Sequence, residues 1–164
     1  MSNPSTPDLI DKFWESVPPA WHQTRAQIRR VAAEKFQLTV EQFQVLRRIR
    51  RGIASVSALA EANHTSRSSV SKAIDALVNR GLVSRSQDPH DRRNIPLALT
   101  DEGGRALSTI YAETEAWLAA RFERLEPGER SHLLEAMDVL DKAFTEDDDG
   151  PRMIDHKRRN TEHK

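Results

Sequence analysis

The chain has 164 residues, 37% hydrophobic and 30% charged, which is long enough for a folded domain with its own buried core. It contains no cysteine, which excludes disulfide bonds, thiolate metal sites and a cysteine redox switch, and its apolar runs are too short to cross a membrane. Net charge is zero, yet residues 1–94 hold 15 basic and 9 acidic side chains whereas residues 95–164 hold 10 and 16, a modest indication of one face that meets a polyanion.

The N-terminal region is predicted to form two helices separated by prolines. The polar segment Met1–Pro7 lacks the apolar stretch of a signal peptide, so we expect a cytoplasmic protein. A short helix over residues 8–17 is interrupted at Pro18 and Pro19, because proline removes an amide donor and clashes with the preceding turn. A second helix restarts at Pro19. Its apolar stripe at helical spacing consists of Trp21, Ile28, Ala32 and Phe36.

Three further helices are expected, and hydroxyl side chains, Thr39 and Ser66, can cap the first and the third of them. Thr39 with Gln42 matches the capping-box pattern, and arginines crowd the end of that helix. A brief turn separates the second of these helices from the third. The expected segments are Thr39–Gly52, Ser55–Asn63 and Ser66–Gly81.

A hairpin and two more helices complete the chain. Residues 82–87 and 94–99 alternate in polarity and predict two strands, the second confined to an edge by Pro96. Two strands alone are marginal, so they must pack on the helices. A long helix is expected over about residues 101–125 and a last one to about residue 144, whereas the polar residues 146–164 are expected to be a disordered tail.

Two short helices joined by a tight turn and followed by a hairpin indicate a winged helix-turn-helix, in a fold that is mainly α and α+β only through the wing. The second helix of such a pair enters the major groove of DNA. Its outward residues are small and polar or cationic, which suits phosphates and base edges, and no acidic residue precedes Asp75. The predicted contacts on this helix are Ser66, Arg67, Ser68, Ser69, Ser71 and Lys72.

The hairpin tip carries the second group of predicted DNA contacts. Arg92 and Arg93 suit the negative potential of a minor groove, and Asp91 could orient the Arg93 guanidinium by a charge-assisted hydrogen bond. By itself this tip could equally be a solvated turn with a local ion pair. Next to the predicted recognition helix we favour the DNA-binding interpretation.

The end regions carry more apolar residues than a small lobe needs, which favours a homodimer. We expect dimerisation helices in residues 1–38 and 101–145 around a DNA-binding domain in residues 39–100. The alternative is packing within one chain. The residues concerned are Leu9, Phe13, Trp14, Trp21, Trp117, Leu118, Leu133, Leu134, Met137 and Leu140.

Linked motifs make the chain resemble the MarR (multiple antibiotic resistance regulator) family. They run from Leu38-Thr39 through Ser66–Leu77, Arg80–Val83 and Arg85 to Asp91-Arg92-Arg93 and Leu99-Thr100 with Gly103. The resemblance implies a homodimer that reads a pseudo-palindromic operator, with Arg85 and the wing residue Arg93 among its DNA contacts. It also implies a regulator that is usually a repressor, in a family many of whose members release DNA when a small ligand binds.

Ligand and catalytic sites are less clearly marked. Trp14, Trp21, His22 and Arg25 could line a pocket for a small aromatic or phenolic effector, although core aromatics and a surface arginine are the plainer interpretation. The six histidines show no metal-ligand spacing, and no phosphate loop or nucleophile elbow is present, so we expect no metal, no cofactor and no enzyme. A winged helix that binds protein or RNA remains the other alternative.

Overall fold

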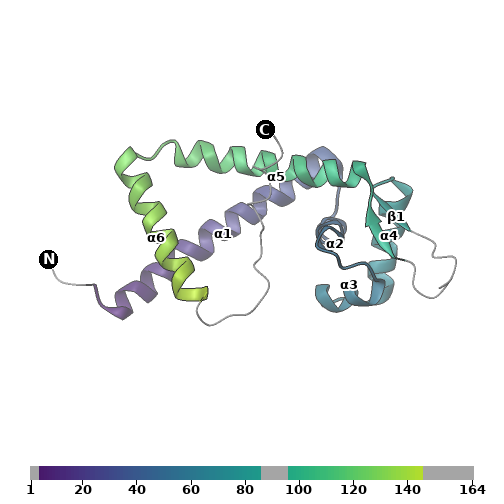
Figure 1. Ribbon diagram of the computed structural model, residues 1–164, viewed down its shortest axis with the longest axis horizontal. Helices are drawn as coiled ribbons and strands as arrows, with labels where there is room; N and C mark the ends of the chain where they lie inside the picture. The colour runs from purple at the N-terminus through teal and green to yellow at the C-terminus, as the bar shows by residue number, and fades with distance from the viewer. Residues whose placement is uncertain (1–3, 86–95, 146–164) are drawn as a thin grey trace, which may run out of the picture. The chain divides into compact units, whose positions relative to one another are not determined.

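The computed structural model describes residues 4–85 and 96–145 (Figure 1). Its contacts divide the chain into two units, residues 1–120 and 121–164, which are described separately. The elements in chain order are α1 (Thr6–Phe36), α2 (Val40–Arg50), α3 (Val56–Asn63), α4 (Arg67–Asn79), β1 (Val83–Arg85), β2 (Leu97–Leu99), α5 (Asp101–Phe122) and α6 (Pro127–Thr145). The predicted mainly α fold with one short hairpin is confirmed.

The prediction of two N-terminal helices is wrong, because α1 is a single helix of 31 residues with Pro18 and Pro19 inside it. The φ that the proline ring imposes is itself helical, so the two prolines remove two hydrogen bonds without turning the chain out of the helix. The helix begins at the N-cap Ser5, which exchanges hydrogen bonds with Asp8 in a capping box. It ends at Gln37, whose φ of 49° is left-handed.

The predicted caps of α2 and α4, Thr39 and Ser66, are confirmed, and α3 also begins at a hydroxyl cap. Gln42 N donates to Thr39 Oγ1 at 3.2 Å, and Thr39 N donates to Gln42 Oε1 at 3.1 Å. Ser55 Oγ accepts the Ala58 amide at 3.2 Å and begins α3. These hydroxyls satisfy amides that have no partner within the first turn, and so they fix where each helix begins.

One hydrophobic core joins α2, α3, α4 and the hairpin to the C-terminal end of α1 and the N-terminal half of α5. Figure 1 shows these short elements gathered at that end of the two long helices. The largest fully buried side chains are Leu46, Leu59, Ile74, Leu77, Leu107, Ile110, Val45, Val70 and Val83. The candidate recognition helix α4 is therefore held in place by a continuous apolar layer that packs against its buried face.

The two strands pair antiparallel, with Val83 opposite Leu99 and Arg85 opposite Leu97. The second strand was expected from residue 94 with Pro96 inside it, but β2 begins only after Pro96, because proline has no amide hydrogen to donate to a partner strand. Leu97 N also donates to Ala54 O at 3.0 Å, which ties the first residue of β2 to the loop between α2 and α3.

The helix α6 belongs to the second unit and buries none of its residues within the described chain. Leu134, Met137, Val139 and Phe144 are 63%, 47%, 69% and 63% exposed. No helix of residues 4–85 and 96–145 combines the length and the apolar character needed to cross a bilayer.

Candidate nucleic-acid interface

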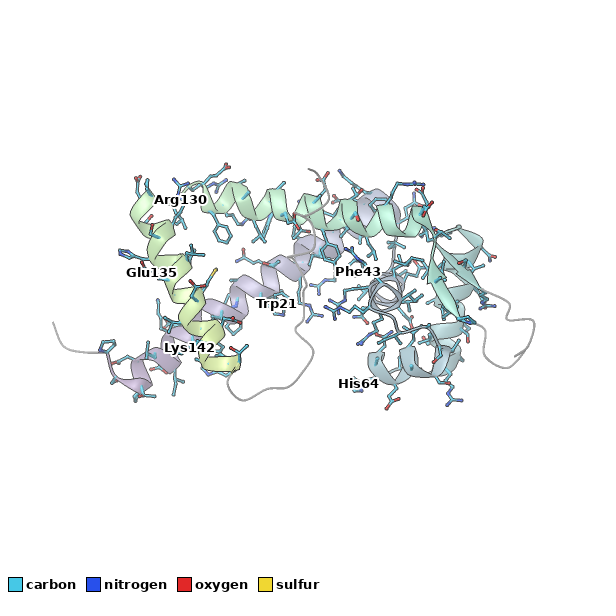
Figure 2. The ribbon with its side chains drawn as sticks, viewed as in Figure 1. Trp21, Phe43, His64, Arg130, Glu135 and Lys142 are labelled. Atoms are coloured by element: carbon cyan, nitrogen blue, oxygen red, sulfur yellow. The ribbon has the colours of Figure 1, made fainter. Side chains whose placement is uncertain are left out.

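The helix-turn-helix is formed by α3, a tight turn and α4. The turn begins at His64, at the end of α3 (Figure 2), whose φ of 51° is left-handed. Thr65 N then donates to Ala60 O at 3.0 Å, which closes the end of α3. Ser66 follows in an extended conformation, and its Oγ accepts the Ser69 amide at 3.1 Å. The chain thus reverses over two residues, and α4 begins at a fixed place.

The structure brings together the predicted contacts on α4 at the N-terminal end of that helix. Ser66, Arg67, Ser68 and Lys72 are exposed, and Ser69 and Ser71 are half-buried. The opposite face of α4 is buried through Val70, Ala73, Ile74 and Leu77. The first turn contains no acidic residue. Free amides at a helix N-terminus, together with hydroxyls and two cations, make this exposed end suited to phosphate and base-edge oxygens.

The predicted DNA contact Arg85 is engaged with the recognition helix. Its Nη2 lies 2.5 Å from Oδ1 of Asp75 on α4, and both side chains are partly exposed. Arg85 therefore connects β1 to α4, a contact that the sequence analysis did not anticipate. The other predicted wing contacts, Asp91, Arg92 and Arg93, lie outside the described residues.

Two further arginines brace the lobe in roles that the sequence does not indicate. Arg48 on α2 donates to the Asn63 side chain and to the Ala62 carbonyl, at the C-terminal end of α3. Arg80 donates to the carbonyls of Phe36 and Gln37, at the C-terminal end of α1. Both place a cation on the negative end of a helix dipole. In sequence these arginines are indistinguishable from surface residues, because their partners lie 14 to 44 positions away.

The predicted effector residues all lie on the exposed face of α1. Trp14 is 65% exposed and Trp21 (Figure 2) is 40% exposed, and the Arg25 guanidinium lies 6.0 Å from the centre of the Trp21 ring. A shallow hollow of about 320 Å³ between α1 and α5 is lined by other residues, namely Gln23, Ala26, Gln27, Arg30 and Trp117. The role of Trp14, Trp21, His22 and Arg25 stays a prediction.

An arginine cluster lies where α1, α2 and α5 meet, and we define it as Arg25, Arg47 and Arg50. Burial lowers the pKa of Arg47; Tyr111 raises it, and Arg51, Arg48 and Arg25 lower it further. The Nε of Arg47 is buried, and no described residue accepts a hydrogen bond from it.

The ring of Tyr111, on α5, lies beside one member of the cluster. The Arg50 guanidinium lies 5.6 Å from the centre of this ring. Among the described residues, no carboxylate pairs with Arg25, Arg47 or Arg50. Within the same residues no three His, Asp or Glu side chains group at metal-binding distance. The cluster is therefore a concentration of positive charge that a bound anion would offset.

Comparison with known proteins identifies the family. Residues 38–95 match the model of the MarR family. The chain is 30% identical over 115 residues to the HTH-type transcriptional regulator YdcH of Bacillus subtilis, covering 63% of this chain and 78% of YdcH. It is 34% identical over 87 residues to the transcriptional repressor MdtR of the same organism, covering 52% of this chain and 56% of MdtR.

Solved structures share the fold. The multiple antibiotic-resistance repressor of Listeria monocytogenes superposes with a TM-score of 0.74 at 20% identity, covering 85% of this chain and 97% of that one. A point mutant of S. aureus MepR bound to an oligodeoxyribonucleotide gives a TM-score of 0.66 at 16% identity, covering 80% and 96%. The matched motifs, the helix-turn-helix with its strands and the identity to YdcH lead to one conclusion: this chain belongs to the MarR family of transcriptional regulators.

Proposed function

We propose that this regulator reads a pseudo-palindromic operator as a homodimer, with the N-terminal end of α4 in the major groove of each half-site. The observation that carries the proposal is the exposed N-terminal end of α4, where hydroxyls, Arg67 and Lys72 lie on the first two turns of a helix anchored by a buried apolar face. Two such helices related by a two-fold axis would meet half-sites about 34–36 Å apart.

Some of the predicted DNA-binding residues would contact base edges, and others would contact phosphates. Arg67 is suited to a guanine edge, because its guanidinium can donate two parallel hydrogen bonds. Lys72 and the hydroxyls of Ser66, Ser68, Ser69 and Ser71 would contact phosphates or base edges and set the register. Arg93, oriented by Asp91 and accompanied by Arg92, would enter the minor groove.

Exposed apolar side chains at both ends of the chain support the dimer. On α1, Leu9, Ile10 and Trp14 are 59%, 52% and 65% exposed, and α6 adds Leu134 and Val139. Large apolar patches on a protein surface commonly mark an interface. We assign dimerisation to residues 1–38 and 101–145, and DNA binding to residues 39–100.

Repression is the direction of regulation that the relatives favour. MdtR, at 34% identity, is named a transcriptional repressor. A repressor that occupies an operator needs no catalytic step, so we assign no enzymatic activity. The site of action would be the cytoplasm, where the DNA of a bacterial cell lies.

A small aromatic acid is the effector that the arginine cluster favours. Arg47 offers a partly buried guanidinium without a described partner, and the Trp21 and Tyr111 rings lie against Arg25 and Arg50. A carboxylate would offset the positive charge, and an aromatic ring would pack beside these side chains. His22 lies less than one turn from Arg25 on the same helix and would complete the site, whereas Trp14 lies about 16 Å away along the helix, too far to contact the same small ligand.

The effector proposal is tested by thermal unfolding with benzoate and with neutral benzyl alcohol. We expect benzoate to raise the Tm of the parent protein and to leave that of Arg47→Gln unchanged, because a ligand stabilises only the state that binds it. Arg124→Gln, which removes an exposed arginine outside the cluster, should respond like the parent. Equal shifts with benzyl alcohol, or an undiminished benzoate shift in Arg47→Gln, would exclude the cluster as the site.

The DNA-binding proposal is tested by titrating labelled operator duplex with variants along α4. Arg67→Ala should weaken binding by about 1–3 kcal/mol and relax the preference at one base pair. Lys72→Ala should weaken all sequences alike and reduce the salt slope by about 1. Asn79→Ala, on the exposed last turn of the same helix, is the matched control and should bind like the parent. Loss of affinity in the control alone would place the interface elsewhere.

A further inference from the structure

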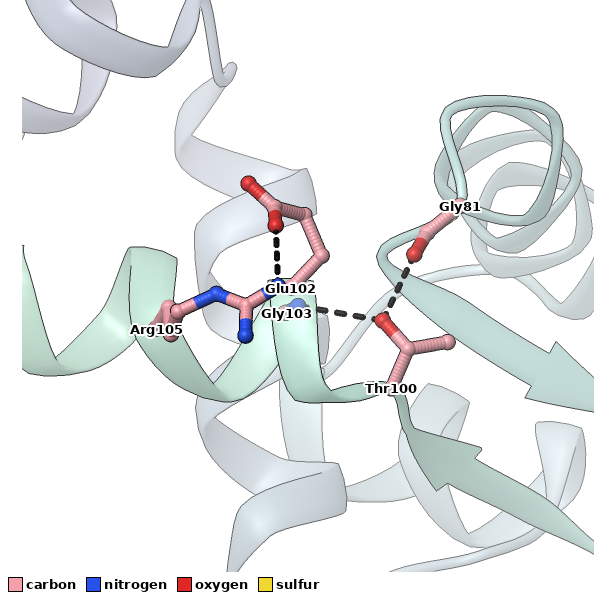
Figure 3. Close-up of polar contacts among 5 residues, drawn as sticks. All are labelled: Gly81, Thr100, Glu102, Gly103 and Arg105. Atoms are coloured by element: carbon pink, nitrogen blue, oxygen red, sulfur yellow. Dashed lines mark hydrogen bonds and ion pairs between the residues drawn. The ribbon is translucent and has the colours of Figure 1, made fainter.

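The exit of the recognition helix is fastened to the start of α5 through Thr100 (Figure 3). Thr100 N donates to Leu82 O at 3.2 Å. The Thr100 hydroxyl donates to Gly81 O at 2.6 Å and accepts the Gly103 amide at 3.1 Å. One hydroxyl group thus bridges a carbonyl just beyond α4 and an amide in the first turn of α5.

Gly103 brings the two backbones into direct contact. A Cβ added at Gly103 would lie 2.0 Å from Leu82 O and 3.0 Å from Leu82 C, both backbone atoms. Because neither atom belongs to a flexible side chain, any residue larger than glycine must push α5 away from the exit of α4. The neighbouring Gly104 is different, since a Cβ there would meet nothing within 4 Å.

Because this contact lies at the first turn of α5, a small change in the angle of the helix there displaces its far end by several ångströms. That helix has 22 residues and is therefore about 33 Å long. A tilt of about 10° at its first turn moves its last turn by about 6 Å, which is nearly two steps of about 3.4 Å along a DNA strand. A small change at Thr100 or Gly103 is thus large on the scale of operator spacing.

We propose that Thr100 and Gly103 are positioning residues that fix the angle between α4 and α5, and so determine the half-site spacing that the dimer accepts. The residues of α4 determine the sequence preference within a half-site. The spacing between half-sites is determined by the contacts of Thr100 and Gly103 with Gly81 and Leu82, which we call the joint. The spacing part rests on the proposed function, the reading of two half-sites by a dimer. The rigidity of the joint is a property of one chain.

The joint is tested first without DNA, by the distance between spin labels on α3 and α5. The chain has no cysteine, so Glu61→Cys and Ala112→Cys, both at exposed positions, supply two unique attachment points. Labelled chains diluted into excess unlabelled protein report the distance within one chain. We expect one narrow distribution in the parent, in Thr100→Ser and in Gly104→Ala. Thr100→Val and Gly103→Ala should broaden it or move it by several ångströms, and unchanged distributions in both variants would overturn the proposal.

The second test measures binding to duplexes that carry one pair of half-sites at spacings changed by one base pair at a time. The parent, Thr100→Ser and Gly104→Ala should prefer one spacing by at least about tenfold, which is about 1.4 kcal/mol. Thr100→Val should keep the sequence preference within each half-site but bind duplexes of several spacings with affinities within about twofold of one another. Because Thr100→Val adds no atom against the Leu82 backbone, it remains informative if Gly103→Ala fails to fold. A parent-like spacing profile in folded Thr100→Val would overturn the role in spacing. A parent that binds no duplex would instead overturn the proposed function, and the label distances would still decide the joint.

Discussion

Arg85 on β1 and Asp75 on α4 form an ion pair, with 2.5 Å between Nη2 and Oδ1, that ties the first strand of the wing to the recognition helix. The pair lies on the exposed side of the lobe, beside the predicted DNA contacts. Arg85 was expected to bind DNA, and this contact gives it a second way to act, through the position of α4.

The pair predicts an unusual result for Asp75→Ala. Removing an acidic residue near DNA strengthens binding if charge alone matters. If the pair positions α4, affinity falls instead, by about two- to fivefold, the scale of an exposed ion pair of up to about 1 kcal/mol. The double variant with Arg85→Ala should be no weaker than Arg85→Ala alone. Tighter binding by Asp75→Ala, measured by duplex titration, would make Arg85 a direct phosphate contact only.

Arg48→Met should destabilise the fold. It removes hydrogen bonds from a guanidinium to the Asn63 side chain and the Ala62 carbonyl. The expected loss is about 1.5–3 kcal/mol in the free energy of unfolding, measured by urea denaturation. Arg50→Met is the control on the same helix; within residues 4–85 and 96–145 it loses a contact with the Tyr111 ring and no ion pair, so it should cost less than about 1 kcal/mol. Equal losses in the two variants would contradict the bracing role of Arg48.

Arg47→Met should have the opposite effect. The Arg47 guanidinium is partly buried and has no described acidic partner, and its pKa is lowered mainly by burial. Replacing it with an apolar side chain of similar length removes that desolvation cost, so stability should rise by about 1 kcal/mol without added anion. Urea denaturation in chloride-poor buffer checks this, and a clear loss of stability would mean that Arg47 already has a partner in the folded protein.

The first turn of α1 predicts a local pH response. Hydrogen bonds from the Ser5 side chain and backbone lower the pKa of Asp8 below its ordinary value. A carboxyl group whose folded pKa is depressed stabilises the fold above its unfolded pKa of about 3.9, and the contribution is lost as pH falls through the folded pKa. An NMR titration should find the pKa of Asp8 below its ordinary value in the parent and higher in Ser5→Ala, which loses the side-chain hydrogen bond but keeps the one from the backbone amide. Identical titration in both proteins would refute the capping box in solution.

Leu134→Glu should weaken the proposed dimer. Leu134 is 63% exposed on α6 and would be covered in the dimer, where a buried carboxylate is unfavourable. Mass measurement over a dilution series should show monomer appearing at higher protein concentration than in the parent. Glu135→Gln, the neighbouring exposed residue, should leave the dimer unchanged. An unaltered dimer in Leu134→Glu would move the interface away from this face of α6.

Local signals in the sequence were enough for most element boundaries in the lobe. The hydroxyls of Thr39, Ser55 and Ser66 each accept a hydrogen bond from the backbone amide three residues later, and this fixed spacing can be recognised in a sequence. The same logic failed at Pro18, because a proline predicts a lost hydrogen bond and not whether the helix continues past it.

Contacts between residues far apart in the chain could not be predicted, because the spacing of residue types carries information only about near neighbours. Arg80 donates to Phe36 O and Thr100 donates to Gly81 O across 44 and 19 positions, and nothing in either residue type announces a partner. The close approach of Gly103 to Leu82 likewise appears only once both backbones are placed. The placement of Ser66 to Lys72 at the exposed start of a helix could be predicted, because it depends only on the helical period and on the N-cap.

Whether two copies of α4 read one operator can be decided by selecting duplexes from a random pool with the purified protein and measuring the mass of the selected complex. We expect an enriched inverted repeat with half-site centres about one helical turn apart, bound by two chains. Arg67→Ala should select the same spacing with a weaker preference at one position of each half-site. A folded protein that enriches no sequence, or binds a single half-site as one chain, would contradict the account.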